Sequence, residues 1–311
     1  MGVGLLFPGQ ASQFPGMGKE LHDAYPVARG VFEEASEALS LDIAALCFRG
    51  TEAELRLTEN TQPAIFTVSV AAYRVLAAEV GLRPACAAGH SLGEYSALVA
   101  AGVLSLRDAV RVLRLRGRYM QEAVPVGEGA MAAILGLSPS QVEEACRIGS
   151  AHGVVSPANL NGGGQIVISG AAAAVAAACE AAKAAGAKRA LPLPVSAPFH
   201  CALMAPAAER LAPELLGVPT GPFSFPVVAN VTAKPYGASD PVAEVLIRQV
   251  TAPVRWEDSV RAMRAAGADA FLEVGPGKVL SGLVRRIEKD AAVSAFCGPA
   301  DLDAARGLLS A

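Results

Sequence analysis

The 311-residue chain has little charge, few aromatic side chains and few histidines. Charged residues make up 18% of it and aromatic residues 5%, whereas 52% of the residues are hydrophobic. The formal net charge is −3, and no block of like charge occurs. Binding to nucleic acid or to an anionic membrane needs clustered lysine and arginine, so we expect neither as a partner. The composition instead indicates a soluble globular enzyme with a large core.

Paired cysteines and targeting segments are also missing. The six cysteines are scattered, and none forms the C-x-x-C pattern of a redox or zinc site. Free thiols are typical of a reducing compartment, so we expect a cytoplasmic protein without a bound metal. The opening "MGVGLLFPGQ" has neither the basic start nor the long apolar run of a signal peptide. Residues 148–179 carry no charge, but "NGGGQ" interrupts them and makes them a poor membrane span.

Short apolar runs alternate with helical patterns through most of the chain. "VGLLF" at 3–7 and "PACAAGHS" at 84–91 predict buried strands, and "FSFPVVAN" at 223–230 predicts another. Strands that alternate with helices favour a mainly parallel sheet covered on both faces. We therefore expect a large α/β domain of the α/β-hydrolase-like type.

Past Pro125 the pattern becomes that of a second, smaller fold. Its elements follow the order β-α-β-β-α-β, which is typical of a ferredoxin-like arrangement, and the larger pattern returns after Pro198. The sequence thus predicts a discontinuous catalytic domain, residues 1–125 and 197–311. A ferredoxin-like subdomain, residues 126–196, is inserted into it.

"AAGHSLGEYSA" at 87–97 holds a serine between two glycines, where a strand runs into a helix. G-x-S-x-G in this context is the nucleophile-elbow pattern. Gly89 and Gly93 leave room for a sharp turn, and the helix N-terminus directs backbone N–H groups toward an oxyanion formed at Ser91. A glycine-flanked serine that only caps a helix has the same pattern, so the motif alone leaves a non-catalytic alternative open.

A serine hydroxyl needs a general base near neutral pH, and the sequence offers four histidines. His90 adjoins the serine, but adjacent side chains on a tight turn usually diverge, which favours a packing role. His22 lies on a polar helix and His152 at the edge of the small subdomain. His200 lies where the chain leaves the insertion and a helix begins, and is the candidate base, although a lone histidine is more often structural. Cys201 is the alternative nucleophile, without an elbow.

The helix predicted over 105–122 carries arginines on two faces. At about 100° per residue, four of them share a stripe that is most simply a solvated face: Arg107, Arg111, Arg114 and Arg118. Arg116 falls on the apolar side, where a guanidinium is costly unless an anion meets it. That anion is either an internal carboxylate such as Glu94 or a substrate carboxylate, which suits the planar guanidinium.

Eight segments stand in order along residues 3–288. They are "FPGQASQFPGMG", "TQPAIF", "GHSLGEYSAL", "RGRYMQEAVP", "SPANLNGGGQIVISG", "PFHCALM", "RQVTAPVRW" and "EVGPGKVLSGL". Together they resemble the family of malonyl-CoA:acyl-carrier-protein transacylases, whose fold also occurs as the acyltransferase domain of polyketide and fatty acid synthases. The resemblance is more specific than any single motif because the segments are spread, in the family's order, along nearly the whole chain.

The resemblance implies catalytic roles for five residues. Ser91 would be the acylated nucleophile and His200 its general base. The backbone N–H groups of Gln10 and Leu92 would form the oxyanion hole. The backbone carbonyl of Gln249 would orient the histidine, so that a Ser–His dyad replaces a full triad.

The resemblance also implies substrate contacts. Arg116 would pair with the malonyl carboxylate, and Gln62 and Asn159 would line the cleft for the acyl group and thioester. Phe199, directly before the histidine, goes with malonyl rather than methylmalonyl selectivity in this family. Pro198 departs from the best-known malonyl pattern, which has alanine there.

The activity implied is transfer of malonyl from malonyl-CoA to the phosphopantetheine thiol of acyl carrier protein. It would run through a malonyl-serine intermediate and supply extender units for fatty acid synthesis, with no cofactor of its own. Three alternatives stay open at this point: a discrete acyltransferase that serves a polyketide synthase, a serine thioesterase or hydrolase, and a non-catalytic carrier-binding subunit.

Overall fold

The structure is a computed structural model that describes residues 2–195, 197–237 and 239–310. The chain divides into two compact units. The first comprises Met1–Gly117, Val218–Asp240 and Ser259–Ala311, and the second comprises Arg118–Gly217 and Pro241–Asp258. The domain boundaries inferred from the sequence, at 125/126 and 196/197, stay a prediction.

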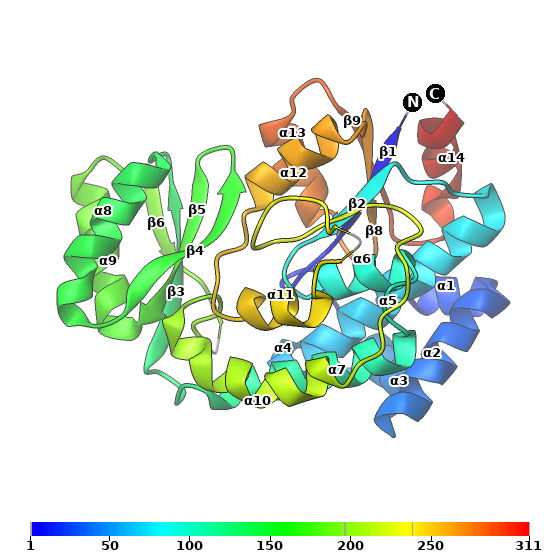
Figure 1. Ribbon diagram of the computed structural model, residues 1–311, viewed down its shortest axis with the longest axis horizontal. Coiled ribbons are helices and arrows are strands. Elements are labelled where there is room, and N and C mark those ends of the chain that lie inside the picture. Colours follow the sequence, from blue (N-terminus) through cyan, green and yellow to red (C-terminus); the bar gives the residue numbers. More distant parts are fainter. Residues whose placement is uncertain (1, 196, 238, 311) are drawn as a thin grey trace. The chain divides into compact units, whose positions relative to one another are not determined.

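The first unit is built on a five-stranded sheet in the order β7–β2–β1–β8–β9 (Figure 1). The strands are β1 Val3–Phe7, β2 Cys86–Gly89, β7 Val227–Val228, β8 Ala270–Val274 and β9 Ala292–Phe296. Every neighbouring pair in this sheet is parallel. β1 and β8 are buried along their whole lengths, as expected of apolar strands covered on both faces. The predicted α/β class with a mainly parallel sheet is confirmed.

Helices surround this sheet. They are α1 Lys19–Ala24, α2 Pro26–Leu39, α3 Ile43–Arg49, α4 Glu52–Arg56, α5 Thr58–Val80, α6 Gly93–Ala100, α7 Leu106–Glu122, α12 Trp256–Ala265, α13 Val279–Ile287 and α14 Leu302–Ser310. α5 is long and apolar enough to cross a membrane by length and composition, but 67% of its most apolar window is buried inside the protein. It packs against α2, α4 and α6, which identifies it as a core helix.

The strand predicted over 223–230 is much shorter than expected. β7 holds only two residues, Val227 and Val228, paired in parallel with β2. Pro226 has no N–H with which to extend the ladder at one end. At the other end the Asn230 N–H donates to Glu94 Oε2 at 3.0 Å instead of to β2.

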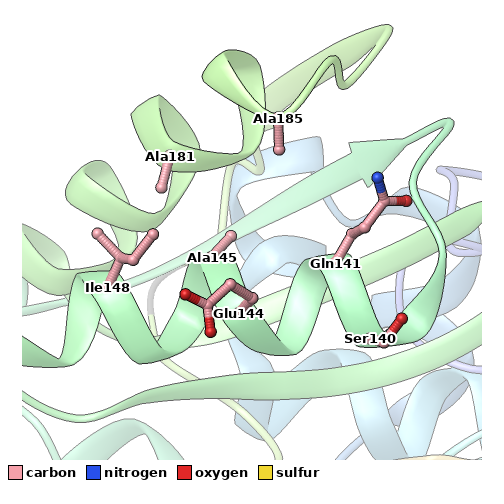
Figure 2. A pocket seen from close by; sticks show the side chains of 7 residues that line it. All are labelled: Ser140, Gln141, Glu144, Ala145, Ile148, Ala181 and Ala185. Carbon is pink, nitrogen blue, oxygen red and sulfur yellow. The ribbon is translucent and has the colours of Figure 1, made fainter.

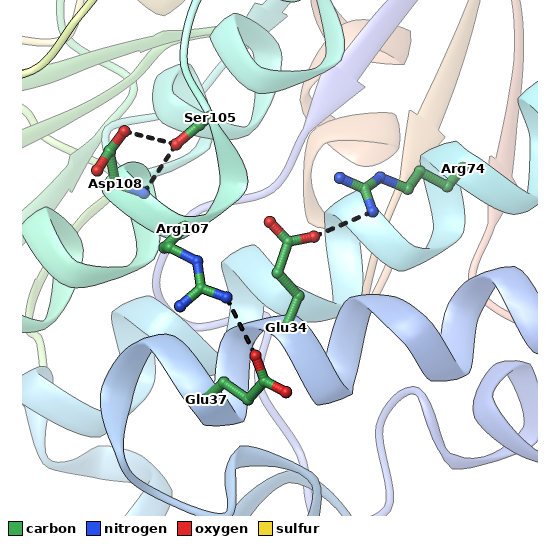
Figure 3. A network of polar contacts seen from close by, with 6 residues as sticks. All are labelled: Glu34, Glu37, Arg74, Ser105, Arg107 and Asp108. Atoms are coloured by element: carbon green, nitrogen blue, oxygen red, sulfur yellow. Dashed lines mark hydrogen bonds and ion pairs between the residues drawn. The ribbon is translucent and has the colours of Figure 1, made fainter.

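The arginine stripe predicted on α7 faces solvent only in part. Arg107 Nη2 lies 3.1 Å from Glu37 Oε2 of α2, and Arg74 of α5 pairs with Glu34, which also belongs to α2 (Figure 3). Ser105 caps α7 by accepting the Asp108 N–H at 3.0 Å. The two ion pairs join α7 and α5 to α2 on the protein surface.

The second unit contains a four-stranded antiparallel sheet in the order β4–β5–β3–β6. Its elements are β3 Gly129–Leu135, α8 Pro139–Gly149, β4 Val155–Gly162, β5 Gln165–Ala171, α9 Ala172–Ala184, β6 Arg189–Pro192, α10 Ala205–Leu216 and α11 Val242–Gln249. A hydrophobic core forms between α8, α9 and the sheet. The β-α-β-β-α-β order and this strand order confirm the predicted ferredoxin-like arrangement.

Candidate active site

A sharp turn joins β2 to α6 at the G-x-S-x-G segment. Ser91 lies in it with φ at +53°, in the left-handed region that non-glycine residues rarely adopt. A Cβ atom on Gly89 would collide with the backbone of Gly93, and one on Gly93 would collide with the Phe7 carbonyl. Both glycines are therefore required for the turn, as the elbow pattern predicts.

Ser91 lies beside a buried guanidinium. Arg116, 1% exposed, donates from Nη2 to Ser91 Oγ at 3.2 Å and from Nη1 to Gln62 Oε1 at 2.9 Å. Because an arginine only donates, the Ser91 hydroxyl oxygen is the acceptor of this hydrogen bond. The structure thus brings three of the predicted site residues together, on the elbow, α7 and α5.

The charge of Arg116 is maintained against strong desolvation. Burial lowers the pKa of Arg116, while electrostatic interactions with Tyr95 and Glu94 and a hydrogen bond with Tyr95 raise it. The guanidinium carbon lies 5.8 Å from the centre of the Tyr95 ring, and burial raises the pKa of that phenol to about 12. Glu94, the internal anion considered for Arg116, accepts hydrogen bonds from the Asn230 N–H and, at 2.5 Å, from the Tyr236 hydroxyl.

The two predicted oxyanion donors lie in the same unit. Gln10 follows β1, whose last residue Phe7 accepts the His90 N–H at 3.0 Å, so the loop after β1 runs against the elbow. Within the described part of the chain, neither the Gln10 nor the Leu92 N–H donates a hydrogen bond. Both donors are therefore available to an oxygen atom that arrives with a substrate.

His200 lies in the second unit, 3% exposed and with φ at +60°. Its Nδ1 lies 2.9 Å from the Gln249 carbonyl oxygen at the end of α11 and 3.1 Å from that of Ala252. A carbonyl oxygen only accepts, so Nδ1 carries the proton and Nε2 of the neutral ring keeps its lone pair. This is the tautomer that a general base requires.

The remaining candidates of the second unit are buried. Phe199 and Asn159 are each 8% exposed, and Asn159 of β4 is bridged to Val254. Cys201, the alternative nucleophile, is 1% exposed and donates from Sγ to the Pro198 carbonyl at 3.1 Å. Burial raises the pKa of this thiol, which makes a thiolate less available and disfavours Cys201 as the nucleophile.

The predicted site residues therefore form two groups, one in each unit. Ser91, Leu92, Gln10, Gln62 and Arg116 belong to the first unit, and His200, Gln249, Asn159 and Phe199 belong to the second. The pairing of Ser91 with His200 across the two units stays a prediction.

Two residues at the elbow were not found from the sequence. Asn230 and Tyr236 contact Ser91 and Glu94 from positions about 140 residues further along the chain, with separations of 139 and 142. The one signal for Asn230 was its place at the end of the strand predicted over 223–230, where side chains of a parallel sheet often reach a site.

Other parts of the chain offer weaker sites. Among the described residues, no group of three or more histidine, cysteine, aspartate or glutamate side chains is placed to hold a metal ion. A pocket between α8 and α9 is lined by the polar side chains of Ser140, Gln141 and Glu144 and by alanine and isoleucine side chains (Figure 2). The Glu144 carboxylate pairs with Arg147, and the residues that line this pocket include none of the predicted site residues.

Comparisons with known proteins agree with one another. A family model for the acyl transferase domain matches residues 5–300. A malonyl CoA-acyl carrier protein transacylase of Escherichia coli (strain K12) is 51% identical over 300 residues, which cover 96% of this chain and 97% of that protein. An acyl-carrier-protein S-malonyltransferase structure from Bartonella henselae matches at 47% identity with a TM-score of 0.96, and 100% of each chain is covered.

A second solved structure includes a carrier. It holds a type II polyketide synthase acyl-carrier protein in complex with its malonyl-transacylase, and it matches at 46% identity with a TM-score of 0.96 over 100% of each chain. Similarity therefore extends over the full length of this chain in both sequence and fold.

Proposed function

The chain belongs to the acyl transferase family, and from this premise we propose that it transfers a malonyl group from malonyl-CoA to the phosphopantetheine thiol of an acyl carrier protein. The observation that carries the proposal is Arg116, a buried cation whose Nη2 lies 3.2 Å from the Ser91 hydroxyl oxygen. Such a cation suits an acyl group with a free carboxylate, and the names of the relatives point to malonyl.

In the first half-reaction, Ser91 Oγ attacks the thioester carbonyl of malonyl-CoA while Nε2 of His200 accepts its proton. The resulting oxyanion is held by the N–H groups of Gln10 and Leu92. The carbon–sulfur bond then breaks, and the proton on His200 passes to the departing coenzyme A sulfur. The products are malonyl-Ser91 and free coenzyme A.

The second half-reaction reverses these steps with a different thiol. The phosphopantetheine thiol gives its proton to His200 and attacks the malonyl-Ser91 ester. The ester bond breaks, Ser91 regains its proton, and malonyl leaves as a thioester on the carrier. The acyl group enters already activated as a thioester, so the proposed chemistry uses no metal or redox cofactor.

Substrate contacts are divided among several residues. Arg116, already oriented by Gln62, would turn its donors to the malonyl carboxylate and so select and align the acyl group. Asn159 would contact the acyl and thioester groups, and Phe199 would restrict branching next to the carbonyl. The Gln249 carbonyl would keep Nδ1 of His200 protonated throughout the cycle.

We propose a cytoplasmic enzyme, supported by six cysteines that are all free thiols. We propose that the carrier serves fatty acid synthesis, with polyketide synthesis as the alternative, since the same transfer chemistry supplies both. Carriers of each type, tested side by side at equal concentration, assign the pathway by their relative transfer rates.

A single assay separates transfer from hydrolysis. The protein is incubated with malonyl-CoA, with and without an acyl carrier protein that bears phosphopantetheine, and both malonyl-carrier and free malonate are quantified. The proposal predicts rapid malonylation of the carrier and little malonate in either case. Malonate release at the same rate with and without carrier would identify a hydrolase instead, and no turnover of either kind would support a non-catalytic carrier-binding role.

A further inference from the structure

We infer that Asn230 is a positioning residue for Ser91. The side-chain amide of Asn230 replaces a backbone peptide group at the end of the β2–β7 ladder. The carboxamide accepts the Ser91 N–H on Oδ1 at 2.8 Å and donates from Nδ2 to the Gly89 carbonyl at 2.7 Å. It therefore holds the backbone on both sides of the elbow. The inference rests on the proposed function in taking Ser91 as the nucleophile.

The hydrogen-bond pattern of a parallel ladder shows what the carboxamide replaces. β2 and β7 pair in register at Ala87 with Val227, and the Ala87 N–H donates to the Pro226 carbonyl at 2.8 Å. Two steps further, a regular ladder would join the Asn230 N–H to the Gly89 carbonyl and the Ser91 N–H to the Asn230 carbonyl. The side chain of Asn230 makes both of these bonds in place of its backbone.

This substitution matters because Ser91 has a strained backbone. A non-glycine residue with a positive φ is sterically strained, so it persists only where neighbouring groups fix it. Glycine at 89 and 93 permits the turn but does not hold it. The Asn230 carboxamide supplies the bonds that hold it, and its use of the Ser91 N–H leaves the Leu92 N–H for the oxyanion.

A second layer fixes Asn230 itself. Its own N–H donates to Glu94 Oε2 at 3.0 Å, and the Tyr236 hydroxyl donates to Glu94 Oε1 at 2.5 Å. Asn230 and Glu94 are fully buried and Tyr236 is 8% exposed, so water does not compete for these bonds. Burial and the nearby Glu94 charge raise the pKa of Tyr236 well above its ordinary value, which keeps the phenol a donor.

The Asn230 carboxamide bonds only to the backbone of Gly89 and Ser91, whereas Arg116 and Gln62 are the groups proposed to lie near the acyl carboxylate. Loss of this carboxamide should therefore slow the chemical step and leave substrate affinity nearly unchanged. A purely structural role would instead lower the folded fraction without changing the rate per folded, active molecule.

The test is the rapid-quench rate at which malonyl-CoA acylates Ser91, measured across substrate concentrations for wild type, Asn230→Ala and Tyr236→Phe. We expect the maximal rate to fall about 10- to 100-fold in Asn230→Ala and a few-fold in Tyr236→Phe, because misplacement of a reacting group by about 1 Å can cost 10²-fold. The malonyl-CoA concentration that gives half of the maximal rate should change by less than about 2-fold. Ser224→Ala, which removes a 2.8 Å bond to Ala101 earlier in the same segment, should acylate like wild type.

Three outcomes would overturn the inference. They are a wild-type maximal rate in Asn230→Ala, a change in the half-saturating malonyl-CoA concentration alone, and an equal loss of maximal rate in Ser224→Ala. If Asn230→Ala does not fold, the rate of Tyr236→Phe decides. If wild-type Ser91 takes no malonyl at all, the proposed function fails. The same variants are then compared by their rates of labelling with a serine-directed fluorophosphonate, which tests Asn230 independently.

Discussion

Arg116 carries most of the chemical information at the scale of single residues. A guanidinium that is 1% exposed is expensive to bury, yet its two terminal nitrogens donate to Gln62 and to Ser91, both neutral groups. Because one of its donors reaches the Ser91 hydroxyl, a carboxylate on an acyl group attached to Ser91 would lie within reach of the guanidinium.

Replacement of Arg116 by alanine should separate acyl groups by charge. Malonyl transfer should fall by about 100-fold or more, because loss of charged hydrogen bonds removes roughly 3 kcal/mol of binding to the carboxylate. Acetyl transfer, which has no carboxylate to lose, should change by only a few-fold. The measurement is kcat/KM for malonyl-CoA and acetyl-CoA, with the exposed Arg111→Ala of the same helix as control. Equal losses for both substrates would assign Arg116 a structural role.

At the scale of elements, the close approach of α7 to the start of α5 sets the position of Arg116. Gly117 lies at this crossing, where an added Cβ would come within 2.5 Å of the Thr58 carbonyl oxygen. Pro63 inside α5 cannot donate to the Glu59 carbonyl, and Arg114 Nη1 of α7 donates to that carbonyl at 3.0 Å instead. The two helices thus depend on each other at the point from which Arg116 reaches Gln62.

Replacement of Gly117 by alanine should lower the stability of the protein, although alanine in place of glycine usually stabilises a helix. Glycine to alanine in a helix interior normally stabilises by up to about 1 kcal/mol. In Gly117→Ala the clash with Thr58 should instead destabilise the protein by about 1–3 kcal/mol and slow malonyl transfer, because α7 must shift. Gly282→Ala in α13, where an added Cβ meets no atom within 4 Å, should show the ordinary stabilisation. Urea unfolding of both variants checks this, and equal stabilisation would contradict the close approach.

Local sequence patterns predicted those elements that local physics determines. Apolar runs and glycine signals predicted β1, β2 and the elbow, and helical periodicity predicted that Arg116 would lie apart from the other arginines of α7. β9 and α14, near the end of the chain, were not predicted. The network of Asn230, Glu94 and Tyr236 could not be predicted either, because its bonds join segments about 140 residues apart through the parallel sheet.

At the scale of the whole molecule, the candidate residues come from segments spread between positions 10 and 249 and fall into two compact units. This explains why no single motif identified the activity and why the ordered set of eight segments did. The six cysteines are likewise spread over both units: five are buried, Cys297 is partly buried, and all six are free. They contribute to packing in both units rather than to a shared site.

The cysteines should be inert in the native protein. Burial raises the pKa of each thiol, to about 12 for Cys86 and Cys146, so at pH 8 their thiolate fraction is on the order of one in ten thousand. Iodoacetamide at pH 8 should leave the activity of the native protein intact. In the time that the unfolded protein takes to react at all six cysteines, the native protein should react at most at Cys297. Mass spectrometry of the alkylated peptides measures this. Rapid modification of Cys201 with loss of activity would instead support it as the nucleophile.

The central claim is that Ser91 accepts the malonyl group and passes it to a thiol. The direct measurement is peptide mass spectrometry after brief acid-quenched incubation with malonyl-CoA, followed by a second sample to which phosphopantetheine-bearing carrier protein is added. The account predicts a malonyl mass on the peptide that contains Ser91, its absence in Ser91→Ala, and its transfer to the carrier in the second sample. An unmodified Ser91 with label on Cys201 or another residue would contradict the account.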